Sequence, residues 1–377
     1  MGEQPDNKAA VLQYQIALTL IPGIGNMIAK KLIAYLGSVE AIFKEKKKYL
    51  NRIPGIGEYI LNSVNSNNLQ TAMARAEKEM AFIDKYHIRP LFYLDEAYPE
   101  RLRHCLDSPV MLYYKGGAGM NVRRILSVVG TRSATGYGKE CCQRVIRDLT
   151  SCQVLIVSGL AYGIDACAHR TAVECDLPTI GVLAHGLDMI YPSTNRALAH
   201  RMLNNGGLIT EFLSASKPDR EHFPKRNRII AGMADAVLVI EAGKKGGALI
   251  TAGLANSYDR DVFALPGRIC DSLSEGCNHL IKTNQAALVQ SAEDIIYNMG
   301  WQDHATREKI PQPLLFTNLT GNEEALIRLL ELRGEASIDW LSVNSGLPVS
   351  QVAAALLELE FKGYVKTLPG RMFRLTS

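Results

Sequence analysis

The sequence predicts an α/β fold built on a doubly wound parallel sheet. Six apolar stretches, beginning at residue 125, alternate with stretches of helical apolar spacing. Most of the six are continuously apolar, which is typical of strands that helices cover on both faces. These observations favour a Rossmann-like domain. The expected strands are Ile125–Gly130, Val154–Gly159, Thr179–Ala184, Leu208–Phe212, Ala236–Ala242 and Val262–Pro266.

A repeated pentapeptide precedes the predicted sheet. The sequence IPGIG occurs at Ile21–Gly25 and again at Ile53–Gly57, each time between stretches of helical apolar spacing. A tight Gly-x-Gly turn that opens a helix presents unpaired backbone N–H groups, and these groups suit a phosphate. The pattern resembles the helix-hairpin-helix motif of sequence-independent DNA binders. The expected secondary DNA contacts are Gly23, Gly25, Lys30 and Lys31.

The second copy of the pentapeptide is weaker, because Glu58 follows it without a nearby lysine or arginine. A second interpretation therefore stays open for both turns. They would then only pack a small helical domain, since such domains keep their fold without binding DNA.

Composition limits the classes of function. With 377 residues and 47% hydrophobic side chains, the chain can bury a sizeable core in about two or three domains. The formal net charge of +4 is mildly basic, so an anionic partner must meet a local patch. The eight cysteines form no CxxC pair, which argues against metal sites and disulfides and favours reduced thiols in the cytoplasm. No apolar run approaches the ~20 residues that span a membrane.

Unusual residues follow the predicted strands at their carboxyl ends, where the ligands of such sheets bind. Glycine-rich turns follow four of the strands, and the helix starts behind them favour anions. The segment His222–Arg228 adds three cations and an asparagine at the same edge. We expect Arg132 and Lys225 to converge there on one positive pocket that binds a phosphate. The expected site residues are Gly130, Arg132, Ser158, Gly159, Gly163, Lys225, Arg226, Asn227, Arg228, Gly246, Gly247 and Thr251.

Two common phosphate ligands fit these loops poorly. A dinucleotide cofactor needs GxGxxG after the first strand, but Cys141 stands where the third glycine should fall. The second strand ends in Ser158 rather than an acidic residue, and there is no Walker A loop. We therefore expect no cofactor and favour a polyanion held through its backbone, as in single-strand binders. Tyr162 and Phe223 are candidates for stacking on its bases, and the alternative for each is a place in the core.

Four loop sequences carry a family resemblance. They are Gly130–Arg132, Ser158–Asp165, Phe223–Gly232 and Leu249–Ala252. Together they resemble the DprA (Smf) family of bacterial DNA-processing proteins, and the match continues in order through both ends of the chain. The resemblance implies single-stranded DNA binding, a homodimer formed through the Rossmann-like domain, and loading of the RecA recombinase in natural transformation. It also implies Arg132 and Lys225–Arg228 as the main strand contacts.

This chain departs from the family at one loop. Members often carry Ser-Gly-Ser before Leu-Ile-Thr-Ala, where this chain has Gly246-Gly247-Ala248. Backbone N–H groups rather than a hydroxyl are therefore expected to contact the strand at this loop.

Two other functions remain open from the residues. The same superfamily contains nucleotide-processing hydrolases, and Asp165 and His169 lie four residues apart, as an acid/base pair on one helix would. The commoner meaning of this pair is an aspartate at a helix start and a partly buried histidine. The hydrolases' Pro-Gly-Gly-x-Gly-Thr loop is also missing, so we assign no catalytic residue and do not expect an enzyme. The third possibility is a structural adaptor that works through its end domains.

The sequence of the C-terminal region predicts a winged helix. Helices are expected at Glu323–Leu332, Ile338–Ser345 and Ser350–Phe361, followed by a hairpin of Tyr364–Leu368 and Met372–Leu375 around Pro369-Gly370. The third helix carries no cation before Lys362, which argues against specific duplex readout and favours a protein contact or regulation. The predicted domains are 1–85 (helical), 86–300 (Rossmann-like), 301–318 (linker) and 319–377 (winged helix).

Overall fold

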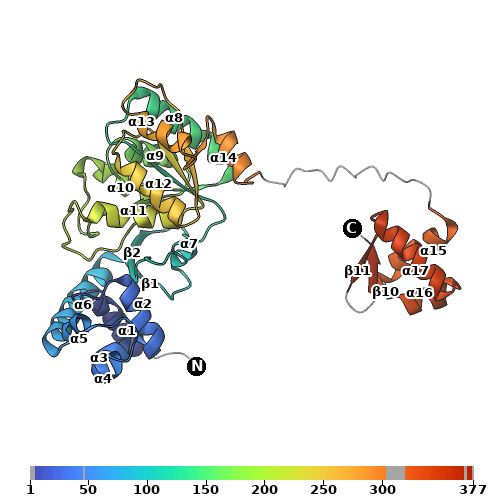
Figure 1. The fold of residues 1–377 in the computed structure, drawn as a ribbon, viewed down its shortest axis with the longest axis horizontal. Helices are drawn as coiled ribbons and strands as arrows, with labels where there is room; N and C mark the ends of the chain where they lie inside the picture. Colours follow the sequence, from blue (N-terminus) through green and yellow to red (C-terminus); the bar gives the residue numbers. More distant parts are fainter. Residues whose placement is uncertain (1–4, 46, 303–318, 369–371, 376–377) are drawn as a thin grey trace. The chain divides into compact units, whose positions relative to one another are not determined.

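A computed structural model describes residues 5–45, 47–302, 319–368 and 372–375 (Figure 1). The chain divides into two compact units, Met1–Gln302 and Asp303–Ser377. The predicted linker lies outside the described residues except for its first two positions, and the predicted hairpin turn Pro369-Gly370 also lies outside them. Trp301, at the start of the predicted linker, is buried in the core of the first unit. The other predicted domain boundaries stay predictions.

A nine-stranded sheet forms the centre of the first unit. Its strand order is β1-β2-β6-β5-β4-β3-β7-β8-β9, and all neighbours from β6 to β9 pair in parallel. The inner strands are buried along nearly their whole length because helices cover both faces. The predicted doubly wound sheet is thus confirmed. The parallel strands are β3 (Ile125–Gly130), β4 (Leu155–Ser158), β5 (Thr179–Val182), β6 (Gly206–Thr210), β7 (Ala236–Ile240), β8 (Asp261–Ala264) and β9 (Ala287–Leu288).

Three strands that the apolar pattern does not predict extend the sheet: β9 at one edge, and β1 and β2 at the other. β2 (Met111–Gly116) pairs antiparallel with β6, and β1 (Arg89–Phe92) pairs antiparallel with β2 at the edge. An edge strand tolerates Pro90 because one side of it makes no ladder hydrogen bonds. Phe92 and Tyr113 belong to the same hydrophobic cluster as the N-terminal helices, so this extension connects the helical region to the sheet.

Two sets of helices cover the sheet (Figure 1). α7, α11, α12 and α13 pack on the face that carries Val129, Val157 and Val237. α8, α9 and α14 pack on the face that carries Leu126 and Val128, and α10 lies beside α9. The helices are α7 (Glu100–Arg103), α8 (Gly136–Asp148), α9 (Ile164–Glu174), α10 (Arg196–Met202), α11 (His222–Met233), α12 (Gly247–Ser257), α13 (Glu275–Lys282) and α14 (Ala292–Asn298), with short 3-10 turns at Leu149–Cys152 and Ser193–Asn195.

The N-terminal region is helical, as predicted, and the repeated pentapeptide forms two turns. Gly23 and Gly55 have φ angles of 77° and 78°, a left-handed conformation that glycine adopts without strain. Gly25 and Gly57 are the N-caps of the helices that follow. The helices are α1 (Pro5–Leu18), α2 (Asn26–Leu36), α3 (Val39–Lys44), α4 (Lys47–Leu50), α5 (Glu58–Ser63) and α6 (Ser66–Tyr86).

The second unit is a winged helix, as predicted. Its core contains Leu326, Leu341 and Leu356, one from each of three helices. A short strand before the second helix was not predicted; it completes a three-stranded sheet of order β10-β12-β11. The elements are α15 (Gly321–Arg333), β10 (Glu335–Ser337), α16 (Ile338–Ser345), α17 (Val349–Phe361), β11 (Val365–Leu368) and β12 (Met372–Leu375).

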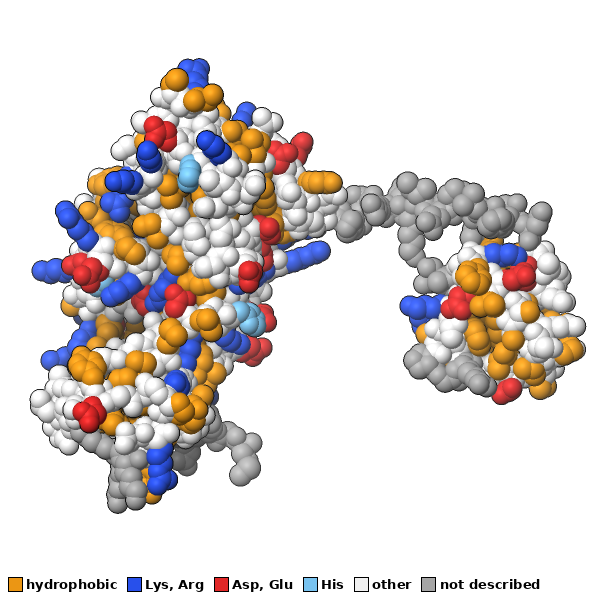
Figure 2. Space-filling model, in the orientation of Figure 1, with side chains coloured by type: hydrophobic (Ala, Val, Ile, Leu, Met, Phe, Trp, Pro, Cys, Tyr) orange, Lys and Arg blue, Asp and Glu red, His pale blue; other side chains and the backbone are white. Residues whose placement is uncertain are grey.

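The surface mixes side chains of every kind. Basic, acidic and hydrophobic side chains are interspersed on the side drawn in Figure 2, in keeping with a net charge of +4. All eight cysteines are free thiols, and six of them are buried. Within the described ranges, no helix combines the length and the apolar character needed to cross a membrane.

Candidate nucleic-acid interface

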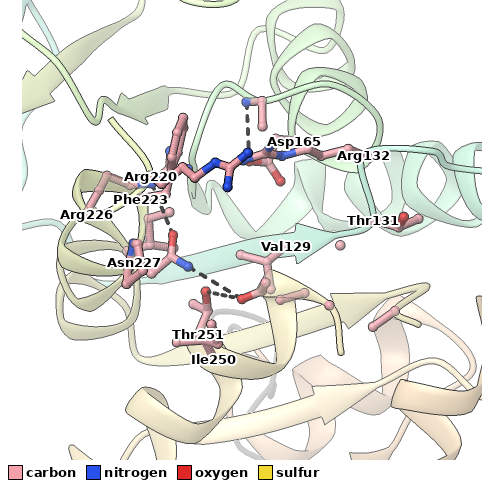
Figure 3. A pocket seen from close by; sticks show the side chains of 18 residues that line it. Val129, Thr131, Arg132, Asp165, Arg220, Phe223, Arg226, Asn227, Ile250 and Thr251 are labelled. Carbon is pink, nitrogen blue, oxygen red and sulfur yellow. Dashed lines mark hydrogen bonds between the residues drawn. The ribbon is translucent and has the colours of Figure 1, made fainter. Parts of the chain in front are cut away.

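A pocket opens at the carboxyl edge of the sheet, between β3 and β7. The chain winds from β3 toward β4 on one side and continues through β7 and β8 on the other, so the strand order reverses at this point. Ligands of open α/β sheets bind in the crevice at such a reversal. The pocket has a volume of about 520 Å³ and is lined from both sides of the reversal, by Gly130 at the end of β3 and Ala242 after β7. We call it the sheet pocket (Figure 3).

The rim of the sheet pocket is basic and aromatic. The guanidinium carbon of Arg132 lies 4.9 Å from the ring centroid of Phe223, a cation–π distance. Arg220, from the loop before α11, lines the same pocket (Figure 3). Among the described residues, neither Arg132 nor Arg220 forms an ion pair. Two arginines are thus available to an anion at the rim.

Arg226 forms part of the pocket wall but is buried. Its guanidinium donates hydrogen bonds to the carbonyl oxygens of Gly159 and Val182, and its Nε donates to Oδ1 of Asn227 at 3.2 Å. Burial lowers the pKa of Arg226 to about 10, and the nearby Asp165 carboxylate opposes that shift. The group therefore keeps its charge at neutral pH, while its donors hold α11 against the loops after β4 and β5.

Asp165 and His169 do not form the acid/base pair considered from the sequence. The Asp165 carboxylate accepts a hydrogen bond from the backbone N–H of Ala161 at 3.3 Å, and burial raises its pKa. The Nδ1 atom of His169 lies 2.7 Å from Oγ1 of Thr179, and burial lowers the pKa of His169 to about 3. Asp165 lines the sheet pocket, whereas His169 does not. The two side chains thus have separate partners.

The glycines of the site have two different roles. A Cβ atom on Gly130 would lie 2.1 Å from the Ile240 carbonyl oxygen, and one on Gly163 would lie 2.2 Å from the Thr131 carbonyl oxygen. These two glycines are therefore required by backbone packing. Gly247, at the start of α12, has open space where a Cβ would stand, and its backbone lines the pocket.

The side chains of Asn227 and Thr251 bind the same backbone carbonyl group. The Asn227 Nδ2 and the Thr251 Oγ1 each donate to the carbonyl oxygen of Gly247 at 3.5 Å (Figure 3). These contacts hold the start of α12 beside α11. Of the residues expected at this site, those that line the sheet pocket are Gly130, Arg132, Arg226, Asn227, Gly246, Gly247 and Thr251.

The remaining expected residues lie elsewhere. Ser158 is buried and donates to the Val128 carbonyl oxygen at 2.6 Å. Gly159 lies beneath the Arg226 guanidinium, which a Cβ would approach to 2.1 Å, and Gly163 is packed against the loop after β3.

Lys225 and Arg228 do not converge with Arg132. Successive residues of a helix point about 100° apart, so Phe223 and Asn227 share the face toward the sheet pocket while Lys225 points away. Lys225 lines a second pocket, beside α2. Arg228 forms a largely buried ion pair with Glu211 and also donates to the Asp107 carbonyl oxygen. The expectation of one pocket shared by Arg132 and Lys225 was therefore wrong. It did not take into account in which direction each side chain of α11 leaves the helix.

One of the two hairpin lysines also differs from the expectation. Lys30 was expected to face a phosphate, but its Nζ donates to Oγ of Ser108 and to the Leu106 carbonyl oxygen, and it is half-buried. Burial, followed by the nearby Arg228 charge, lowers its pKa. The Nζ of Lys31 lies 3.0 Å from the position that a Cβ on Gly55 would take, beside the second turn. Gly25 lines the same second pocket as Lys225.

One rim cation was missed from the sequence. Arg220 lies three residues before Phe223, outside the segment His222–Arg228 in which the site cations were sought. The sequence carried little signal for it, because Asp219 and Glu221 flank Arg220 and mask it as a cation. Only the loop conformation shows that Arg220 lines the sheet pocket.

Family comparisons agree with this architecture. Residues 89–300 match the family model for DNA recombination-mediator protein A. Residues 311–371 match the model for the DprA winged helix domain. These matches span the sheet domain and the winged helix.

Individual relatives extend the likeness to nearly the whole chain. Protein Smf of Synechocystis is 31% identical over 96% of this chain and 98% of its own length. The crystal structure of DNA processing protein A from Streptococcus pneumoniae superposes with a TM-score of 0.64 at 32% identity, over 79% of this chain and 98% of that one. A Helicobacter pylori DNA processing protein A, whose structure is described as giving its single-stranded DNA binding mode, superposes with a TM-score of 0.52 at 28% identity. The superposition covers 57% of this chain and 96% of that one. The chain therefore belongs to the DNA recombination-mediator protein A (DprA/Smf) family.

Proposed function

We propose that the chain binds single-stranded DNA in the sheet pocket and loads the RecA recombinase onto that strand during natural transformation. Family membership and the single-stranded DNA binding of the H. pylori relative support the proposal. The observation that carries it is the rim of the pocket, where the Arg132 guanidinium lies over the Phe223 ring. A positive track beside an aromatic face is the combination by which proteins hold single strands.

In this proposal each side of the pocket meets a different part of the strand. Arg132 and Arg220 contact phosphates, since neither forms an ion pair among the described residues. Phe223, half-buried at the rim, offers its ring to a base. The open backbone at Gly247 allows the strand to approach the start of α12 closely.

We propose that the protein acts by binding, without turnover and without a cofactor. A hydrolase would need a base facing the bound anion, and Asp165 is the carboxylate that lines the pocket. Its carboxylate accepts a hydrogen bond from the Ala161 backbone N–H and lies beside the buried Arg226 charge, an arrangement that supports a structural role. We further propose that the protein works in the cytoplasm as a homodimer.

Fluorescence anisotropy tests the binding proposal. Labelled oligo-dT and a duplex of equal length are titrated at two salt concentrations with the wild type, Arg132→Ala, and a control, Arg147→Ala, which removes an exposed arginine near the end of α8. We expect preference for the single strand, a roughly tenfold loss of affinity in Arg132→Ala, and a log–log salt slope reduced by about 0.7 for each lost phosphate contact. Arg147→Ala should bind like the wild type.

Either of two results would contradict the proposal: equal affinity for both DNA forms, or an Arg132→Ala variant that binds as the wild type does. If binding behaves as expected, RecA filament assembly on coated single strands, with and without this protein, tests the loading step. Sedimentation velocity tests the homodimer.

A further inference from the structure

A second pocket, which we call the seam groove, lies where the first hairpin meets the sheet. It has a volume of about 730 Å³. Asn26, Met27 and Ile28 of α2 line one side, Phe212 lies in the segment after β6, and Lys225 stands on the first turn of α11. Segments far apart in the sequence thus build a single groove within the first unit.

The walls of the seam groove are held in fixed positions. The Asn26 Oδ1 accepts a hydrogen bond from the backbone N–H of Val110 at 2.9 Å. One turn further along α2, Lys30 donates to Ser108. On the opposite side, Arg228 pairs with Glu211 and donates to the Asp107 carbonyl oxygen. These contacts tie α2 and α11 to the chain segment that leads into β2, so the groove is preformed.

The seam groove combines one free cation with apolar side chains. Asp107 and Glu211 line it as well, but each of these carboxylates already accepts a hydrogen bond from another side chain. Lys225 is exposed and forms no ion pair within the described ranges. Met27 is 62% exposed although it is hydrophobic. Phe212 stacks on His222 with ring centroids 4.1 Å apart and lines the groove. A lysine beside apolar and aromatic surface suits a phosphate that carries a base.

The groove is continuous with the sheet pocket through a single turn of α11. Phe223 and Pro224 line the sheet pocket, and the next residue, Lys225, lines the seam groove. A strand that lies against Phe223 and passes over the first turn of α11 therefore reaches Lys225 directly.

We propose that the seam groove is a second subsite for the same single strand. Lys225 holds a phosphate there, and bases beyond it pack against Met27 and Phe212. This inference rests on the proposed function, because the strand enters from the sheet pocket. It gives the N-terminal hairpin a part in DNA binding through its apolar and backbone surface, while Lys30 serves to dock α2.

Oligonucleotide length separates the two subsites. Labelled oligo-dT of about 6 nucleotides should fill the sheet pocket alone, and one of about 18 should fill both. The variants are Lys225→Gln and Met27→Glu, which remove a cation and add an anion at exposed positions. The matched control is Lys282→Gln, an exposed lysine on α13, which Figure 1 shows far from α2.

We expect each groove variant to weaken binding of the longer oligonucleotide by about three- to tenfold and to leave the shorter one within about twofold of the wild type. Lys282→Gln should change neither. Equal losses at both lengths, or no loss at the longer length, would overturn the second subsite. Arg132→Ala should weaken both lengths, so a failure of the sheet pocket is distinguishable from a failure of the groove alone. Thermal melting of each variant confirms that it is folded.

Discussion

His169 lies fully buried on α9, beside Thr179 on β5. Its spacing from Asp165 fits an acid/base pair, yet each side chain bonds to a different part of the fold. Burial without a charged partner favours the neutral imidazole, and the pKa of His169 falls to about 3 for that reason. A residue type that often does chemistry is here part of the core.

His169 should make stability depend on pH. Its pKa is lower in the folded chain than the 6.5 of an ordinary histidine, so the unfolded chain binds more protons below pH 6.5 and stability is lost as pH falls. Between pH 7.5 and 5.0 this one group should remove about 2 kcal/mol of unfolding free energy. Urea unfolding at both pH values should show that loss of unfolding free energy in the wild type. His169→Gln should not show it.

The matched control is His200→Gln, because His200 is exposed on α10. The unfolding free energy of His200→Gln should show the same pH dependence as that of the wild type. Equal pH dependence in the wild type and His169→Gln would show that the buried imidazole takes up a proton without cost to the fold.

At the scale of elements, α11 joins the two candidate subsites and is held in place by two arginines. Arg226 donates to the loops that follow β4 and β5. Arg228 pairs with Glu211 and donates to the segment before β2. Both belong to the basic run that suggested a DNA contact, but their guanidinium groups bond to the protein. The residues of this helix left for a ligand are those at its first turn, Phe223 and Lys225.

Gly159 should be essential for the position of α11. A Cβ atom there would lie 2.1 Å from Nη1 of Arg226, which is buried and cannot move into solvent. Gly159→Ala should therefore lower the unfolding free energy by about 3 kcal/mol, as expected when a buried charge loses its partners. Gly253→Ala is the control, because nothing stands within 4 Å of its Cβ position and it is exposed within α12. That change should stabilise the chain by about 1 kcal/mol.

Urea denaturation of both glycine variants provides the measurement. If Gly159→Ala and Gly253→Ala had similar stabilities, α11 would be able to shift without loss of stability and would not be a fixed wall between the sheet pocket and the seam groove.

At the scale of the whole molecule, the chain consists of two units with separate cores. The first is organised around the sheet and the second around the leucines of α15, α16 and α17. On α17, Leu357 and Phe361 are 55% and 85% exposed, and this helix carries no cation between Val349 and Phe361. An exposed apolar face without positive charge fits the predicted protein contact better than readout of a duplex.

The two units should unfold independently. The chain has two tryptophans, and Trp301 lies in the core of the first unit while Trp340 packs against that of the second. Leu356→Ala, a truncation in the second core, should cost that unit about 3 kcal/mol. Leu356→Ala is combined with Trp301→Phe or with Trp340→Phe, and urea unfolding is followed by the fluorescence of the remaining tryptophan. The unfolding midpoint reported by Trp340 should fall, and the midpoint reported by Trp301 should not change. A joint shift of both midpoints would mean that the two cores unfold as one.

The sequence by itself determined the order and type of most elements. Continuous apolar runs predicted the parallel strands because burial on both faces leaves no polar positions. The pentapeptide repeat located both N-terminal turns, since glycine is needed where φ is positive. β1, β2, β9 and β10 were not predicted, because strands of two to six residues carry little periodicity and depend on their neighbours for pairing.

The tertiary structure alone decided which side chains share a site. Arg132 and the glycines of the sheet pocket were predictable because the carboxyl ends of parallel strands meet at one edge. The directions of Lys225, Arg226 and Arg228 were not, because they depend on the rotation of α11 against the sheet. The role of Lys30 was likewise decided by packing, since Ser108, 78 residues further along the chain, lies within hydrogen-bond reach of it. A sequence lists the charges, but only the packed chain determines whether each one meets solvent, a ligand or another part of the protein.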